Sequence, residues 1–200
     1  MKLRIMAAAC FLALAVGVPV SALWAEERIS FQLKNGRAAE TVEIPVPKGF
    51  VRSGLDMPPQ VLVLSTNDSD LTRCFNEDPE GDCSYERDIE VLVITFIGPK
   101  KSAGGSVIDA ARSSYGAANP GMKFFGSSPD IALIDYGLRK YDNFQYQLLY
   151  GSVFIENWQV EVRWTMNMSK VPSNLVRERK KRLEMFMAEI KALAAQANPK

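Results

Sequence analysis

The sequence predicts an α+β domain: an antiparallel sheet with an N-terminal β-hairpin, packed against a middle helix and a long C-terminal helix. Two observations support this fold class. Several segments alternate apolar and polar residues, which is the two-residue period of a half-buried strand, whereas residues 106–115 and 173–197 show helical spacing. The composition is that of a globular protein, with 47% hydrophobic and 24% charged residues.

The hairpin is predicted over residues 29–46. Both ends of this stretch alternate apolar with polar residues, and Asn35-Gly36 between them favours a tight type I′ turn because both residues tolerate positive φ. Pro45 and Pro47 have no N–H to donate to a neighbouring strand. The second strand is therefore expected to end at a sheet edge.

Further strands are expected over residues 61–65 and 90–97, which are short runs rich in β-branched side chains. Residues 131–168 also have strand character, although the pattern does not place the breaks between strands. Its clearest part runs from Trp158 to Met166, where every second residue is apolar, so one face of that strand is expected in the core. Ser173 is the expected N-cap of the last helix.

The first 25 residues have the layout of a secretory signal peptide. Lys2 and Arg4 precede an apolar stretch, and small residues follow, with cleavage expected after Ala22 or Ala25. The apolar stretch is shorter than the roughly 20 residues of a membrane-spanning helix. The sequence thus predicts a signal peptide over 1–25, a single domain over 26–200, and a periplasmic or secreted location.

Two cysteines remain after this leader, Cys74 and Cys83, and in an oxidising compartment an even pair is expected to form a disulfide. Their eight-residue separation differs from the C-x-x-C spacing of redox-active pairs, so a structural bridge is favoured. Pro79 and Gly81 between them are turn formers that allow the chain to return.

The cysteines lie in a strongly acidic stretch, because residues 68–90 hold nine acidic and two basic side chains. We expect a solvated surface loop that contacts a protein partner, with these predicted contact residues: Glu77, Asp78, Glu80 and Asp82. An EF-hand is excluded because Arg87 stands where that loop needs a bidentate Glu. An irregular weak calcium site is the alternative to the solvated loop, and no metal site is predicted.

The chain has no histidine, which excludes Ser-His-Asp and Cys-His catalysis and histidine-containing zinc sites. Its net charge of +1 gives no indication of nucleic-acid binding. We therefore predict a protein that is not an enzyme and needs no cofactor. Carboxylate pairs for glycoside cleavage could be drawn from Asp130, Asp135, Glu156 and Glu161, but any chain with this many acids offers such pairs.

The charges are unevenly distributed along the chain. The acidic residues 68–90 contrast with residues 170–200, which hold eight basic and three acidic side chains. Two oppositely charged regions suit oriented docking on a partner, because complementary fields set register and association rate. Alternatively, the two regions face each other within one molecule.

The order of these elements, together with the segment Val42-Glu43-Ile44-Pro45-Val46-Pro47-Lys48-Gly49-Phe50, resembles the PsbP-like α+β fold, including the bacterial DcrB-related envelope proteins. The resemblance implies a non-enzymatic binding or assembly role and supplies no active site. The predicted function is an exported, non-enzymatic binding or interaction module of the Gram-negative cell envelope. The alternatives are a periplasmic immunity or inhibitor protein acting through the acidic disulfide loop, and a histidine-free hydrolase.

Overall fold

The computed structural model describes residues 25–35, 38–77, 89–98, 106–111, 121–126, 128–141, 144–155, 158–168 and 173–197. Seven antiparallel strands form the main sheet in the order β3-β4-β5-β9-β8-β7-β6, and two more form a separate hairpin. The elements, in chain order, are β1 (Ala25–Asn35), β2 (Ala38–Pro47), β3 (Val51–Arg52), β4 (Val61–Ser65), α1 (Asp68–Glu77), β5 (Glu90–Ile97), α3 (Val107–Ala111), β6 (Lys123–Phe124), β7 (Ile131–Tyr141), β8 (Phe144–Ile155), β9 (Trp158–Asn167) and α4 (Ser173–Ala197).

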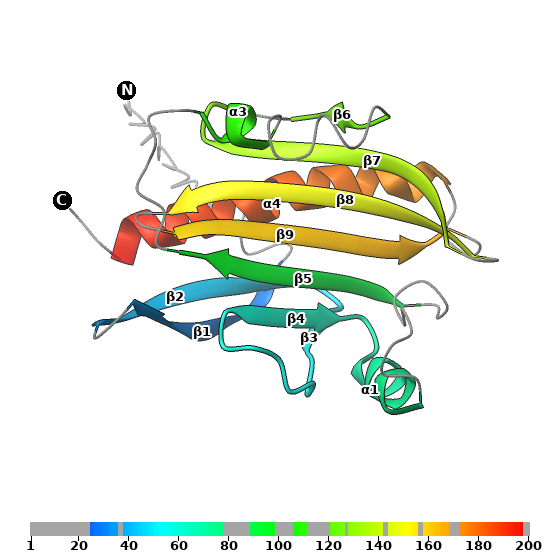
Figure 1. Cartoon of the computed structure of the whole chain (residues 1–200), viewed down its shortest axis with the longest axis horizontal. Helices are drawn as coiled ribbons and strands as arrows, with labels where there is room; N and C mark the ends of the chain where they lie inside the picture. Colours follow the sequence, from blue (N-terminus) through cyan, green and yellow to red (C-terminus); the bar gives the residue numbers. More distant parts are fainter. Residues whose placement is uncertain are drawn as a thin grey trace, which may run out of the picture.

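One face of the main sheet, here called the inner face, is covered by α4 and the β1–β2 hairpin (Figure 1). Strand residues such as Leu92 and Trp164 pack there against Phe186 and Ile190 of α4, in the largest core cluster. The α+β prediction, with its N-terminal hairpin and long C-terminal helix, is confirmed. This layered arrangement forms because the sheet has an apolar face, and that face is stable only when a second layer of helix and hairpin covers it.

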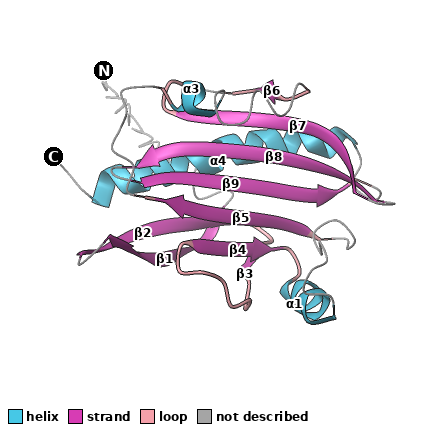
Figure 2. Ribbon diagram, in the orientation of Figure 1, coloured by secondary structure: helices cyan, strands magenta, loops and turns pink. Residues whose placement is uncertain are grey.

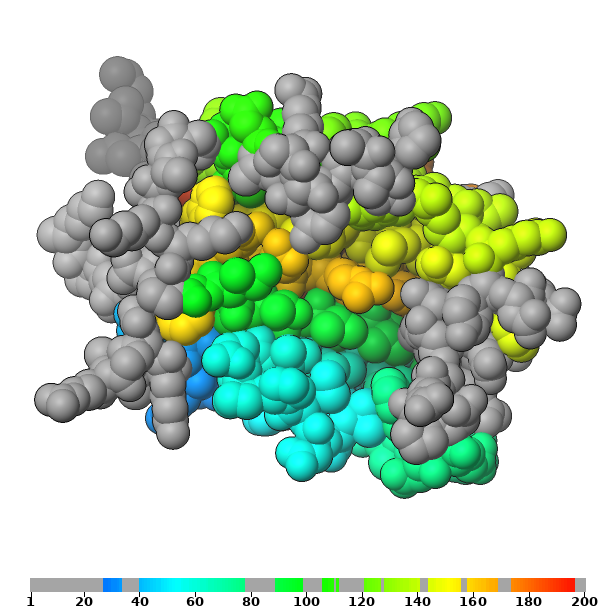
Figure 3. Space-filling model, in the orientation of Figure 1, coloured from blue at the N-terminus to red at the C-terminus, as the bar shows by residue number. Residues whose placement is uncertain are grey.

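Within the described residues, helices cover the opposite, outer face at its flanks (Figure 2). Helix α1 packs over β4 and β5 through Leu71 and Cys74, and α3 packs over β7 and β8 through Val107 and Ala111. The central strand β9 lies between these two small clusters, and its residues are visible in the middle of this face in Figure 3.

Helix α1 corrects the prediction of a continuous acidic loop over residues 68–90. Asn67 caps the helix, since its side-chain oxygen accepts the N–H of Asp70 at 3.2 Å, and Asp68 and Asp70 lie in the first turn, where acids favour the helix dipole. Leu71 and Cys74 then lie on one buried face. This apolar spacing was the signal of a helix, but the surrounding charge obscured it.

The hairpin is confirmed, with its turn one residue later than predicted. Asn35 pairs with Ala38, so the connection falls on residues 36–37, which lie outside the described residues. Within the described part of the chain, β2 pairs only with β1. Its other edge therefore tolerates Pro45 and Pro47, as the sequence predicted.

The strands expected over residues 61–65 and 90–97 are confirmed as β4 and β5. The predicted core face of the chain from Trp158 to Met166 is also confirmed, because Trp158 and Trp164 are both buried. Their indole N–H groups donate to carboxylates, from Trp158 to Glu40 at 2.6 Å and from Trp164 to Glu90 at 2.9 Å.

Two cations in the first turns of α4 dock the helix on the inner face. Arg179 donates two hydrogen bonds to Glu90 of β5, through Nη2 at 2.6 Å and Nε at 2.9 Å. Lys180 pairs with Asp135 of β7. The basic C-terminal region and the last residue of the acidic stretch therefore meet within the molecule, as one of the two interpretations of the charge layout expected.

Glu189 of α4 lies at the contact between the helix and the hairpin. Its side chain is only 10% exposed, its Oε1 lies 3.9 Å from Nη2 of Arg28, and its Oε2 has no hydrogen-bond partner. Burial raises the pKa of this carboxyl above its usual value of 4.5, and the Arg28 guanidinium opposes that shift more weakly. Because the folded state binds the proton more readily than the unfolded state, stability decreases as the pH rises through the raised pKa.

Glu189→Gln is therefore expected to raise the Tm at about pH 7.5, by roughly 2–4 °C for an effect of about 1 kcal/mol. The gain should decrease on acidification and vanish at about pH 4, where the carboxyl is protonated in both states. Thermal unfolding followed by circular dichroism at both pH values measures it. An equal shift at the two pH values would show that charge burial is not the cause.

Candidate functional site

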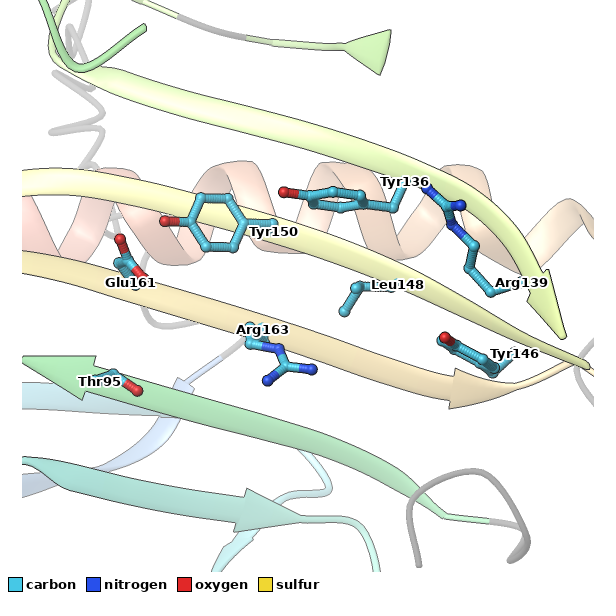
Figure 4. A pocket seen from close by; sticks show the side chains of 8 residues that line it. All are labelled: Thr95, Tyr136, Arg139, Tyr146, Leu148, Tyr150, Glu161 and Arg163. Atoms are coloured by element: carbon cyan, nitrogen blue, oxygen red, sulfur yellow. The ribbon is translucent and has the colours of Figure 1, made fainter. Parts of the chain in front are cut away.

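A pocket of about 520 Å³ lies on the outer face of the sheet. Four adjacent strands, β5, β9, β8 and β7, supply its lining, and Figure 4 shows these side chains on one face. The lining residues are Thr95, Tyr136, Arg139, Tyr146, Leu148, Tyr150, Glu161 and Arg163. Three tyrosines and three charged groups thus converge on a surface that is built on rigid strands.

Strand register places most of these side chains together. Glu161 and Arg163 are two residues apart in β9, so the strand period directs both to the outer face. Glu161 lies opposite Thr95 of β5, and Arg163 lies opposite Tyr150 of β8. The alternation of Glu161 and Arg163 with the tryptophans is evident in the sequence, but their neighbours on other strands are not.

A β-bulge in β7 places the last two lining residues, Tyr136 and Arg139, on the outer face. Tyr136 and Arg139 are three residues apart and would face opposite sides of a regular strand. The register shifts between Asp135 and Leu138, and Gly137 there adopts a φ of 73°. The extra residue brings Arg139 to the same face as Tyr136, and its guanidinium carbon lies 5.9 Å from the ring centroid of that tyrosine.

The bulge is held from the inner face by Asp135. Its carboxylate accepts the N–H of Gly137 at 2.7 Å and a hydrogen bond from the side-chain amide of Gln147. The same carboxylate pairs with Lys180 of α4. The contact that docks the helix therefore also fixes the outward geometry of Tyr136 and Arg139.

Glu161 and Arg163 have different surroundings. The side-chain amide of Gln159 donates to Glu161 at 2.8 Å and to Ser152 at 3.0 Å, which tethers Glu161 on its own strand. Arg163 is exposed and makes no hydrogen bond, ion pair or ring contact within the part of the chain that the structure describes. On the aromatic wall, Tyr136 and Tyr150 pack edge to face, with ring centroids 6.3 Å apart.

Of the carboxylates considered for glycoside cleavage, the three that the structure describes have separate surroundings, and Asp130 pairs with Lys191. Asp135 points to the inner face, whereas Glu161 lines the outer pocket, and Glu156 lies outside the described residues. Among the described residues, no group of three or more His, Cys, Asp or Glu side chains could hold a metal ion. The pocket lining itself contains one carboxylate and no serine or cysteine nucleophile.

The predicted partner-binding residues fall mostly outside the structural description. Asp78, Glu80, Asp82 and Cys83 lie in residues 78–88, which are not described. Glu77 is exposed at the end of α1. A contact surface formed by the acidic residues therefore stays a prediction.

Cys74 is buried and disulfide-bonded, and the predicted partner Cys83 lies outside the described residues. We expect peptide mapping without reductant to recover a Cys74–Cys83 bridged fragment. Cys74→Ser should lower the stability by roughly 2–3 kcal/mol in the chain-entropy account of such a short loop. A bridge from Cys74 to Cys10 would contradict the predicted pairing.

Within the described residues, no helix combines the length and the apolar character that crossing a membrane requires. No protein-family model and no curated protein matches the chain. Among the solved structures that resemble it are a point mutant of protein Mog1 and the Saccharomyces cerevisiae Ran-binding protein Mog1p. In each case the TM-score is 0.47 at 9% identity, over 84% of this chain and 94% of the other.

The comparison corrects the predicted PsbP-like or DcrB-related identity, because the solved structures that resemble the chain are Mog1 structures. The exported cell-envelope module, with its signal peptide and periplasmic or secreted location, is corrected on the same finding, since the two structures are of Mog1 and one is named as a Ran-binding protein. The family resemblance relied on element order and on a strand that ends in Pro and Gly. Backbone chemistry favours such turns in unrelated chains.

Proposed function

We propose that the protein is a non-enzymatic binding protein and that a segment of a protein partner occupies the outer-face pocket. The observation that carries this proposal is the lining, in which tyrosines and arginines converge on four rigid strands. Tyrosine and arginine are the residues that contribute most often to protein–protein binding energy. The described lining has no serine or cysteine and no second carboxylate, which supports a binding role over hydrolysis.

A protein segment fits this pocket better than a small free ligand. Small-molecule sites bury most of the ligand surface, whereas the described lining of this pocket comes from one face of the sheet alone. Among the described residues, the lining contacts a ligand from that face only. A segment that belongs to a larger partner is covered on its other side by the partner itself.

The proposal is tested with an array of heptapeptides of acidic, basic and uncharged composition. We expect at least one class to bind the full chain, and Tyr146→Ala to weaken that binding about tenfold, as for loss of a contact worth over 1 kcal/mol. Met57→Ala is the matched control, because Met57 is also a large, accessible side chain but lies outside the pocket. Circular dichroism verifies that both variants fold.

Two results would overturn the proposal. The first is the absence of binding in every peptide class, or binding that Tyr146→Ala leaves unchanged. The second is turnover in a panel of hydrolase substrates that Glu161→Gln abolishes, which would make the pocket an active site.

A further inference from the structure

We infer that the pocket recognises a carboxylate in an acidic peptide segment and that Arg163 is the group that binds it. This inference rests on the proposed function and adds the chemistry of the ligand. It starts from the position of Arg163 in β9, the central strand of the seven. Side chains at the centre of a sheet face are usually covered by packing, whereas the guanidinium of Arg163 is exposed.

Arg163 has unused hydrogen-bonding capacity. A guanidinium carries five N–H donors in a planar fork that matches the two oxygens of a carboxylate. Within the described residues, no acceptor engages that fork. Glu161, the acidic residue of the same lining, is tethered instead by the amide of Gln159 at 2.8 Å.

The surroundings strengthen such a contact. Arg163 lies between Tyr150 of β8 and Val93 of β5 in the sheet register, and Leu148 also lines the pocket. Apolar and aromatic neighbours exclude water once a ligand covers them, and an ionic hydrogen bond is then stronger than at an open surface. A carboxylate on an extended segment could meet Arg163 while its flanking residues contact the tyrosines.

The charge of the pocket favours an anion. Its lining has two positively charged side chains, Arg139 and Arg163, and one negatively charged side chain, Glu161. Arg139 lies over Tyr136 at the other wall, as Figure 4 shows, so the positive charge is spread across the pocket. A nucleic acid is a less suitable ligand than an acidic peptide. Glu161 would repel its phosphates, and the described lining has no row of cations to bind them.

The test uses two heptapeptide libraries that differ only at the central position, which is Glu in one and Gln in the other. The full chain should bind the Glu library roughly 10–100-fold more tightly than the Gln library, because hydrogen bonds to charged groups contribute about 1.5–3 kcal/mol. Arg163→Gln should weaken binding of the Glu library more than binding of the Gln library, so that the preference is lost. Arg52→Gln, which removes an exposed arginine from the same sheet outside the pocket, should keep the preference.

Each outcome bears on one proposal or both. Equal binding of the two libraries, or an equal loss for both in Arg163→Gln, overturns the carboxylate inference. Displacement of the Glu library by millimolar inorganic phosphate also overturns it and indicates a phosphate site. If only uncharged peptides bind and Tyr146→Ala weakens them, the inference fails and the proposed function stands; if no peptide binds, both fail.

Discussion

Arg179→Met is expected to lower the free energy of unfolding by about 3–5 kcal/mol. The arginine and Glu90 are both largely buried, with side chains 14% and 12% exposed. Removal of the guanidinium leaves a buried carboxylate without its counter-charge, and among the described residues its remaining hydrogen bond comes from the indole N–H of Trp164 at 2.9 Å. Domains of this size are stable by only about 5–15 kcal/mol, so the loss should be evident in urea unfolding followed by tryptophan fluorescence.

A double variant separates charge burial from lost packing. Glu90→Gln together with Arg179→Met removes both charges, and it should recover most of the loss because no ion remains buried. Arg177→Met is the matched control on the same helix, where the arginine is exposed, and it should change stability by less than about 0.5 kcal/mol. If Arg179→Met unfolds at the same urea concentration as Arg177→Met, the ion pair does not stabilise the fold.

Gly98→Ala is expected to destabilise the protein by about 3 kcal/mol, at the upper end of overpacking effects. A Cβ atom at this position would lie 2.1 Å from Cε3 of Trp158 and 2.4 Å from Cζ3. The ring has little freedom to move, because it is buried and its N–H donates to Glu40 at 2.6 Å. The backbone or the indole must therefore shift, and the hairpin would lose its hydrogen bond to β9.

Gly121→Ala is the control for this change, because a Cβ there would meet nothing within 4 Å. Thermal unfolding of the two variants should differ by several degrees, with Gly121→Ala close to the unchanged protein. A Gly98→Ala protein that melts like the Gly121→Ala protein would contradict the close packing of Gly98 on Trp158.

The candidate pocket could not be predicted from the sequence. Its residues come from four strands, and only their register brings Thr95, Glu161 and the tyrosine wall together. The bulge at Gly137 reverses the facing expected for Arg139, and a period of two cannot anticipate an inserted residue. The sequence places Arg163 on the polar face of its strand, but which of the described residues contact it depends on neighbours that are distant in sequence.

By itself, the sequence determined those parts of the protein whose signals are local. The hairpin, β4, β5 and α4 follow from periodicity, turn residues and caps, because these act within a few residues of one another. Tertiary structure alone decided the pairing of Arg179 with Glu90, the helix formed by the first acidic residues, and the pocket on the outer face. The physical reason is that burial, charge pairing and strand register are properties of contacts between distant segments, which only the folded chain brings together.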